Sequence, residues 1–282
     1  MNQALQIGPL SLPFGLLLTL VAIGLGGFFA HRVARAAGID AEPSLTQMLI
    51  VGVLAARLGF VLRWHEQYLE LPTSIFNIRD GGWEPAVGVV AALLFGLLKA
   101  RRNADLRKAV VIAPVIAGAV LLLGGIAAVL LKPPPVPLPA LTLQAMDGRA
   151  VSLADFVGKP TVVNLWASWC PPCRREMPAM QHSQAANPDV NFVFVNQGEE
   201  PWVVAEYLKR QGLILGNVLL DPQGSVGVAL GQGALPTTLF FDVEGRLVSA
   251  RLGELSSATL NQHLVAIRVV SGEKPKPAPT SP

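Results

Sequence analysis

The chain of 282 residues is 51% hydrophobic and only 15% charged, and its mean hydropathy is +0.47. This composition excludes a single soluble domain, because several long apolar stretches fill the first 131 residues while the remainder has an ordinary globular composition. The net charge of +3 does not indicate nucleic-acid binding, since the Lys and Arg residues lie beside apolar spans and form no basic face.

Four apolar spans are predicted in the N-terminal half, at residues 10–30, 45–62, 85–98 and 109–131. Three of them approach the roughly 20 residues that a helix needs to cross a bilayer, and the third span is short. The first span has no small-residue cleavage site, so we expect it to be retained rather than removed as a signal peptide. We therefore expect residues 1–131 to form a domain of about four transmembrane helices.

Positive charges follow the first and the third of these spans, with His31, Arg32 and Arg35 after one and Lys99, Arg101, Arg102, Arg107 and Lys108 after the other. Loops rich in Lys and Arg face the cytoplasm. Because the number of spans is even, both ends of the chain are predicted to lie outside the cytoplasm. This places the C-terminal half in the periplasm of a multi-pass protein of the bacterial inner membrane.

Short motifs run through the membrane half: Ile-Gly-Pro-Leu at 7–10, Ala-Arg-Leu-Gly-Phe-Val-Leu at 56–62 and Asp-Gly-Gly at 80–82. Over about residues 7–100 this region resembles prolipoprotein diacylglyceryl transferases. The family has a histidine shortly after the Gly-Gly pair, but residues 83–88 here are Trp-Glu-Pro-Ala-Val-Gly. We therefore expect a membrane scaffold without transferase activity. Arg57 is either a functional charge inside a span or a side chain that reaches the interface.

A proline-rich linker at 132–139 separates the two halves, and a Pro- and Lys-containing tail at 271–282 is expected to be disordered. Between them, residues 140–270 alternate strand and helix patterns. Strands are predicted at 141–145, 150–152, 161–167, 191–196, 237–241 and 246–252, and helices at 171–185, 201–211 and 257–270. A βαβ unit followed by a hairpin and a helix is the thioredoxin arrangement, so the fold class is α/β thioredoxin-like.

The chain has two cysteines, Cys170 and Cys173, at the point where a predicted strand gives way to a helix. Unpaired N–H groups at a helix N-terminus favour a thiolate, so Cys170 is predicted to be the exposed nucleophile and Cys173 the buried resolving thiol. A structural disulfide across so small a loop would add little stability. A metal pair would need further soft ligands, and the nearby Met177, Met180 and His182 leave a copper-handling role open.

The run Trp-Ala-Ser-Trp-Cys-Pro-Pro-Cys-Arg-Arg-Glu-Met-Pro at 166–178 resembles the TlpA/ResA-like thiol-disulfide oxidoreductases. Further matching motifs are Asp-Gly at 147–148, Leu-Leu-Asp-Pro at 219–222 and Leu-Pro-Thr-Thr at 235–238, and the resemblance covers about residues 140–270. It implies that Pro236 is cis and that Leu235 offers its backbone to a partner peptide. Pro171 and Pro172 stiffen the first helical turn beside the nucleophile.

Acidic and aromatic residues near the cysteines are further candidates. The resemblance implies that Glu176 tunes the cysteine pKa values and carries protons, although a solvated surface Glu beside Arg174 and Arg175 is the alternative. Asn164 replaces the buried aspartate of thioredoxin. Trp166 is expected in the core and Trp169 on the surface, in contact with partners. Weaker candidates are Glu199 and Glu200.

The sequence thus predicts a membrane-anchored periplasmic thiol-disulfide oxidoreductase that works through Cys170 and Cys173 and needs no other cofactor and no metal. Its expected partners are periplasmic protein thiols and disulfides, the lipid bilayer and a DsbD-type membrane electron donor, with no nucleic acid. A reductase is favoured; net disulfide oxidation, lipid transfer or a scaffold role, and copper handling are the alternatives.

Overall fold

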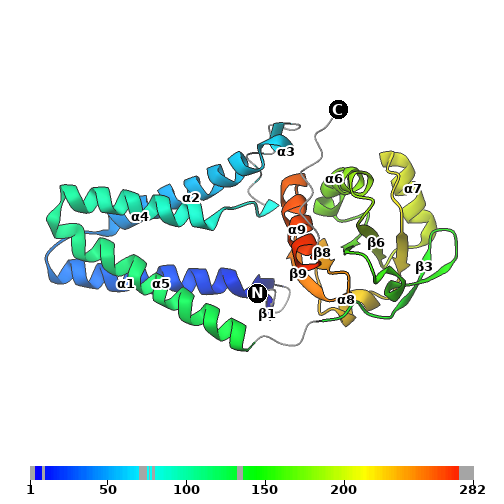
Figure 1. Cartoon of the computed structure of the whole chain (residues 1–282), viewed down its shortest axis with the longest axis horizontal. Coiled ribbons are helices and arrows are strands. Elements are labelled where there is room, and N and C mark those ends of the chain that lie inside the picture. The colour runs from blue at the N-terminus through cyan, green and yellow to red at the C-terminus, as the bar shows by residue number, and fades with distance from the viewer. Residues whose placement is uncertain are drawn as a thin grey trace. The chain divides into compact units, whose positions relative to one another are not determined.

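The computed structural model describes residues 4–7, 10–69, 75, 77, 80–131 and 136–272. The chain divides into two compact units (Figure 1). The first unit comprises Met1–His65 and Gly82–Pro133, and the second comprises Glu66–Gly81 and Pro134–Pro282. The second unit therefore takes in a short segment that lies, in sequence, between two helices of the first.

The first unit is built from four long helices. They are α1 (Phe14–Ala36), α2 (Glu42–Arg63), α4 (Pro85–Arg102) and α5 (Arg107–Leu130), and the short 3₁₀ turn η3 (Ala104–Leu106) leads into the last. Helix α1 packs along α5, and α2 packs along α4 (Figure 1). A small hairpin of β1 (Ala4–Ile7) and β2 (Leu10–Pro13) precedes α1, so the first predicted span begins four residues later than expected.

Three helical segments in the described part of the chain are long and apolar enough to cross a membrane: Phe14–Ala36, Glu42–Arg63 and Ala104–Leu130. The third predicted span, residues 85–98, also forms a helix, α4 (Pro85–Arg102), but the last turn of this helix carries Lys99, Arg101 and Arg102. Large apolar side chains on these helices, such as Leu20, Leu54 and Leu122, are exposed. An apolar exterior of this kind suits contact with acyl chains rather than with water.

Small residues set how closely the helices of the first unit approach. A Cβ atom added to Gly26 in α1 would lie 2.5 Å from the carbonyl oxygen of Ala113 in α5. Between α2 and α4, a Cβ on Gly88 would lie 2.6 Å from the carbonyl oxygen of Gly52. Glycine at these positions lets two backbones meet, as is typical of helix pairs in membranes.

The second unit is built around one seven-stranded sheet, with strand order β4-β3-β7-β6-β5-β8-β9. Strands β5, β6 and β7 are parallel, and the other neighbours are antiparallel. The strands are β3 (Thr142–Ala145), β4 (Ala150–Ser152), β5 (Thr161–Trp166), β6 (Asn191–Gln197), β7 (Val218–Asp221), β8 (Thr237–Phe241) and β9 (Leu247–Leu252).

Helices cover both faces of this sheet. They are α6 (Pro171–Ala186), α7 (Pro201–Gln211), α8 (Ser225–Ala229) and α9 (Ser257–Val270), with η4 (Leu153–Phe156) before β5 and α3 (His65–Leu69) on the separate segment. One apolar cluster joins Trp166 to Met177 and Leu260, and the opposite cluster joins Leu165 to Leu153 and Val226. Because both faces of β5 are buried, the whole strand is apolar apart from Thr161 and Asn164.

Strand β7 and helix α8 are not predicted from the sequence. Strand β7 lies inside the sheet between β6 and β3, and all four of its residues are buried. Its apolar core is only three residues long, Val218 to Leu220, and it follows Asn217, whose φ is +53°. So short an apolar run is ambiguous by periodicity alone, which explains the omission.

Gly26→Ala should destabilise the first unit by about 1–3 kcal/mol, because the added methyl group overlaps the α5 backbone. Gly27→Ala is the matched control, since a Cβ there meets nothing within 4 Å and alanine favours a helix. Unfolding of the full chain in detergent measures both variants. Equal stability of the two would contradict the observed α1–α5 packing.

Candidate functional site

The two cysteines form a disulfide at the N-terminus of α6, directly after the turn that follows β5, with an S–S distance of 2.10 Å and a Cα–Cα distance of 5.3 Å. Cys170 is the N-cap of the helix, and its Sγ accepts a hydrogen bond from the Cys173 N–H at 3.3 Å. Pro171 and Pro172 fill the first two helical positions, where a missing N–H costs little.

Cys170 is 3% exposed and Cys173 is fully buried. Cys173 is therefore the more buried of the two, as predicted. Cys170 was predicted to be exposed, but it is buried in this disulfide form. Both cysteines belong to the apolar cluster that contains Trp166 and Met177.

Glu176 lies one helical turn after Cys173 and is only 1% exposed. Its Oε1 accepts a hydrogen bond from Asn164 Nδ2 at 2.8 Å, and its Oε2 accepts one from the Leu255 N–H at 3.0 Å. Burial raises the pKa of this carboxyl to about 8, although both hydrogen bonds and the charge of Arg251 act to lower it. The alternative that Glu176 is a solvated surface residue is thus wrong. Its neighbours Arg174 and Arg175 are exposed, as that alternative assumed for all three residues.

Asn164 connects the acid to the sheet. Its Nδ2 also donates to Thr238 Oγ1 on β8 at 3.0 Å, while its Oδ1 is buried without a hydrogen-bond partner among the described residues. The same amide turned by 180° would present Oδ1 to the O–H of a protonated Glu176. An asparagine at this position can therefore hydrogen-bond the carboxyl in both of its protonation states, although the amide releases no proton of its own.

The remaining predicted residues surround the disulfide. The Leu235–Pro236 peptide bond is cis, as predicted. Leu235 packs against the apolar cluster that holds both cysteines, and Pro236 is buried at the start of β8. Trp169 is 67% exposed and Trp166 is fully buried, so the expected surface and core positions of these two tryptophans are confirmed.

Glu199, a weak candidate from the sequence, forms hydrogen bonds with the turn that precedes the disulfide. Its carboxylate accepts hydrogen bonds from the Ser168 N–H at 2.7 Å, from Ser168 Oγ at 2.5 Å and from Asn196 Nδ2 at 2.7 Å. The carboxyl ends of the parallel strands β5 and β6 bring these residues together. Sequence reasoning missed Arg251 and Leu255, since both come from the far end of the chain with no motif to mark them.

A metal-binding cluster is not found among the described residues, where no group of three His, Cys, Asp or Glu side chains is placed to hold an ion. Met177 and Met180 are fully buried in the apolar cluster, whereas His182 is exposed on α6. Of the three side chains considered as copper ligands, the two methionines thus lie in the core and the histidine lies on the surface.

A redox disulfide at the tip of the helix that follows a central parallel strand defines a thioredoxin-like thiol-disulfide oxidoreductase. Consistently, residues 135–264 match the family model described as Redoxin. The chain is 34% identical over 132 residues to the thiol-disulfide oxidoreductase ResA of Geobacillus thermodenitrificans, a match that covers 46% of this chain and 75% of the relative. The chain belongs to the ResA family of thiol-disulfide oxidoreductases.

Further proteins are similar to parts of this chain. ResA of Bacillus subtilis is 30% identical over 132 residues, covering 46% of this chain and 73% of that protein. A solved structure of a thioredoxin-family thiol:disulfide interchange protein from Chlorobium tepidum is 28% identical, with a TM-score of 0.43, and covers 50% of this chain and 99% of its own. Residues 2–127 match the prolipoprotein diacylglyceryl transferase family model, a longer stretch than the 7–100 expected from motifs.

The buried carboxyl predicts a pH-dependent stability. Between about pH 4.5 and 8 the unfolded chain has an ionised Glu176 and the folded chain a protonated one, so unfolding releases a proton. The free energy of unfolding should therefore fall by about 1.4 kcal/mol per pH unit across this window from this group alone. Glu176→Gln should remove that slope, as measured by denaturant unfolding at several pH values.

The exposed Glu200 supplies the control, because Glu200→Gln should leave the slope unchanged. An identical slope in both variants would show that Glu176 ionises normally in the folded chain.

Proposed function

We propose that this protein is a membrane-anchored thiol-disulfide oxidoreductase whose redox domain, at residues 140–270, works in the periplasm and reduces disulfides in partner proteins. The observation that carries the proposal is the Cys170–Cys173 disulfide at the N-terminus of α6, with the buried Glu176 one turn behind it. The Redoxin match and the ResA relatives support the class of reaction.

Exchange starts from the dithiol form. The Cys170 thiolate, favoured at the helix N-terminus, attacks one sulfur of the partner disulfide, and the second partner sulfur leaves as a thiolate that takes up a proton. Cys173 then loses its proton and attacks Cys170 Sγ. The mixed disulfide breaks, the partner leaves as a dithiol, and two electrons have passed from Cys170 and Cys173 to the partner.

Glu176 is proposed to handle the proton of Cys173. A carboxyl group with a pKa of about 8 is well matched to a thiol, whose ordinary pKa is about 8.5, so the proton passes between them with little cost in either direction. The apolar cluster around the cysteines keeps water out of this transfer. An ordinary exposed Glu would be ionised at neutral pH and would accept a thiol proton poorly.

Partner binding is assigned to the residues around the sulfurs: Trp169, Pro171, Pro172, Leu235 and Pro236. Trp169 offers a large exposed ring next to the nucleophile, which suits contact with an incoming chain. Leu235 packs against the cluster that contains both cysteines, and the cis peptide bond joins it to the buried Pro236. An extended partner segment is proposed to pass close to Cys170 along the backbone of Leu235.

The direction of exchange depends on where electrons come from. The sequence has no cysteine besides this pair, so its own membrane helices cannot relay electrons through thiols. A separate membrane protein of DsbD type is proposed to reduce the disulfide after each cycle. A reduction potential near the oxidising end of the thioredoxin-like range, about −120 mV, would instead make this chain a net oxidase.

The N-terminal half, residues 1–131, is proposed to anchor the redox domain in the bacterial inner membrane. The cation distribution supports a periplasmic position for the loop after α2 and for the C-terminal half. Residues 66–81 of that loop belong to the same compact unit as the redox domain, which supports a common side. The linker at 132–139 and the tail at 271–282 complete the proposed organisation.

A scaffold role is proposed for the diacylglyceryl transferase-like region, because residues 83–88 lack a histidine. Arg57 has a structural use there: its Nη1 donates to the Gly82 carbonyl at 2.8 Å and its guanidinium lies 5.9 Å from the Trp83 ring centroid. Transfer of diacylglyceryl groups by the full chain would contradict this proposal.

Cys173→Ala should trap partner proteins as mixed disulfides on Cys170, at least about tenfold more than the unaltered chain, because the resolving attack is lost. Cys170→Ala is the matched control and should trap none. Non-reducing electrophoresis of detergent-solubilised membranes from cells that express each variant measures the trapped complexes. Trapping by Cys170→Ala alone would reverse the roles assigned to the two sulfurs.

A further inference from the structure

The segment at residues 66–81 lies in the sequence between α2 and α4, yet it belongs to the unit of the redox domain. Its described residues are 66–69, 75, 77, 80 and 81. Two of them are buried: Tyr68 is 3% exposed and Asp80 is fully buried. A tyrosine and an aspartate are rarely so completely buried on a connecting segment, so these two side chains belong to packed structure.

Asp80 interacts with a tyrosine through a hydrogen bond and with an arginine through its charge. Its Oδ2 accepts a hydrogen bond from the Tyr68 hydroxyl at 2.9 Å. Its negative charge acts on Arg251 of β9, on which Glu176 exerts the next-largest attraction. The adjacent Gly81 has a φ of +74°, and a Cβ there would overlap the Arg251 guanidinium. Gly81 therefore lies directly against the guanidinium of the arginine whose charge acts on Glu176.

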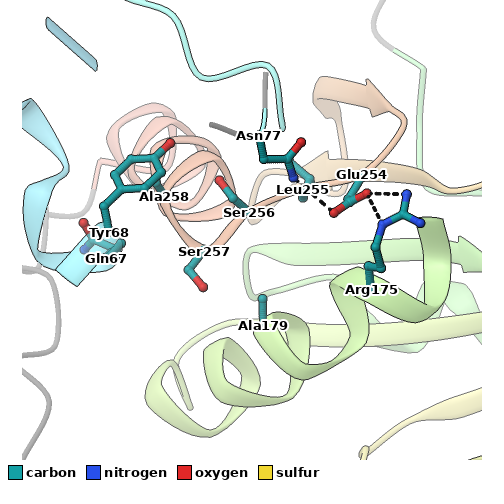
Figure 2. A pocket seen from close by; sticks show the side chains of 10 residues that line it. All are labelled: Gln67, Tyr68, Asn77, Arg175, Ala179, Glu254, Leu255, Ser256, Ser257 and Ala258. Atoms are coloured by element: carbon teal, nitrogen blue, oxygen red, sulfur yellow. Dashed lines mark hydrogen bonds and ion pairs between the residues drawn. The ribbon is translucent and has the colours of Figure 1, made fainter. Parts of the chain in front are cut away.

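A second contact lies a few residues away. Asn77 Nδ2 donates a hydrogen bond to Glu254 Oε1 at 3.3 Å. The other carboxylate oxygen of Glu254, Oε2, forms a salt bridge with Arg175 Nη2 at 2.7 Å. These three side chains and Tyr68 of α3 line a pocket with a volume of about 150 Å³. Figure 2 shows Asn77, Glu254 and Arg175 together on one side of this pocket. Leu255, which donates its N–H to Glu176, lines the same pocket.

We propose that Tyr68, Asp80 and Gly81, among the described residues of this segment, are a functional part of the redox site, in which Asp80 is a positioning residue that fixes and offsets the charge of Arg251 beside Glu176. The stretch of chain between α2 and α4 then supplies residues to the redox site, in addition to connecting two helices of the first unit. The proposal rests on the role given to Glu176 in exchange, and it concerns how readily that carboxyl binds its proton.

The charges around Glu176 determine the sign of the effect. Arg251 attracts the ionised carboxylate and Glu254 repels it, while Arg175 and Asn77 bind Glu254. His263 also lies near Arg251, but burial lowers the pKa of this histidine to about 4, so it is neutral at pH 7. Removing the charge of Asp80 would leave Arg251 less compensated, which favours the ionised Glu176.

Asp80→Asn in the full chain should therefore move the titration midpoint of Glu176 to lower pH by at least about half a pH unit. The carbonyl stretch of a protonated carboxyl, followed by infrared spectroscopy against pH and assigned by its loss in Glu176→Gln, measures the midpoint directly. This readout does not depend on exchange activity, so a failure here is separate from a failure of the proposed function.

Two further variants separate the proposed effect from simple loosening of the segment. Tyr68→Phe removes one hydrogen bond to Asp80 and should cause a smaller shift in the same direction, whereas the exposed Glu66→Gln should cause none. In an Arg251→Gln background, adding Asp80→Asn should cause no further shift. An unchanged midpoint in Asp80→Asn, or an equal shift with and without Arg251, would overturn the proposal.

Discussion

A carboxyl group buried in apolar surroundings one helical turn from a disulfide is the constraint on which this site depends. Ionised carboxylates lose water contacts on burial, and the loss favours the protonated form. Around Glu176 this loss outweighs two hydrogen bonds and a nearby arginine, so its pKa rises to about 8. The fold thus holds a proton donor and acceptor where ordinary chemistry would give a fixed negative charge.

The sheet supplies three of the residues around that carboxyl. Asn164 comes from β5, Thr238 from β8 and Arg251 from β9, and these are three adjacent strands. The Leu255 N–H comes from the turn between β9 and α9, and α6 itself carries Cys173 and Glu176. Because the strands are fixed by their register, the acid and the sulfurs are held in one geometry while the partner changes.

Much of this arrangement is readable in the sequence. The two cysteines are read directly from the sequence. Apolar periodicity predicts a strand at 161–167, which ends one residue earlier in the structure, and it predicts the helix bounds at 201–211 and 257–270. The burial of Glu176 is not readable, because a helix-surface Glu and a buried one have the same local pattern. It depends on β9 and α9, about 80 residues later in the chain.

Other features were hidden for the same reason. Strand β7 has too short an apolar run to be recognised alone, and its place inside the sheet comes from pairing with β6 and β3. Nothing in the local sequence marks Asp80 as part of the redox unit, since the Asp-Gly-Gly motif is accounted for by the resemblance to diacylglyceryl transferases. Long-range contacts of this kind are fixed by packing, which local propensity does not encode.

The pH dependence of disulfide exchange by the reduced chain tests the central claim most directly. With a small model disulfide as oxidant, the rate should depend on a group that titrates near pH 8, and Glu176→Gln should abolish that dependence while the cysteine titration remains. A profile of identical shape in the two proteins would contradict the account, because the buried carboxyl would then take no part in moving the thiol proton.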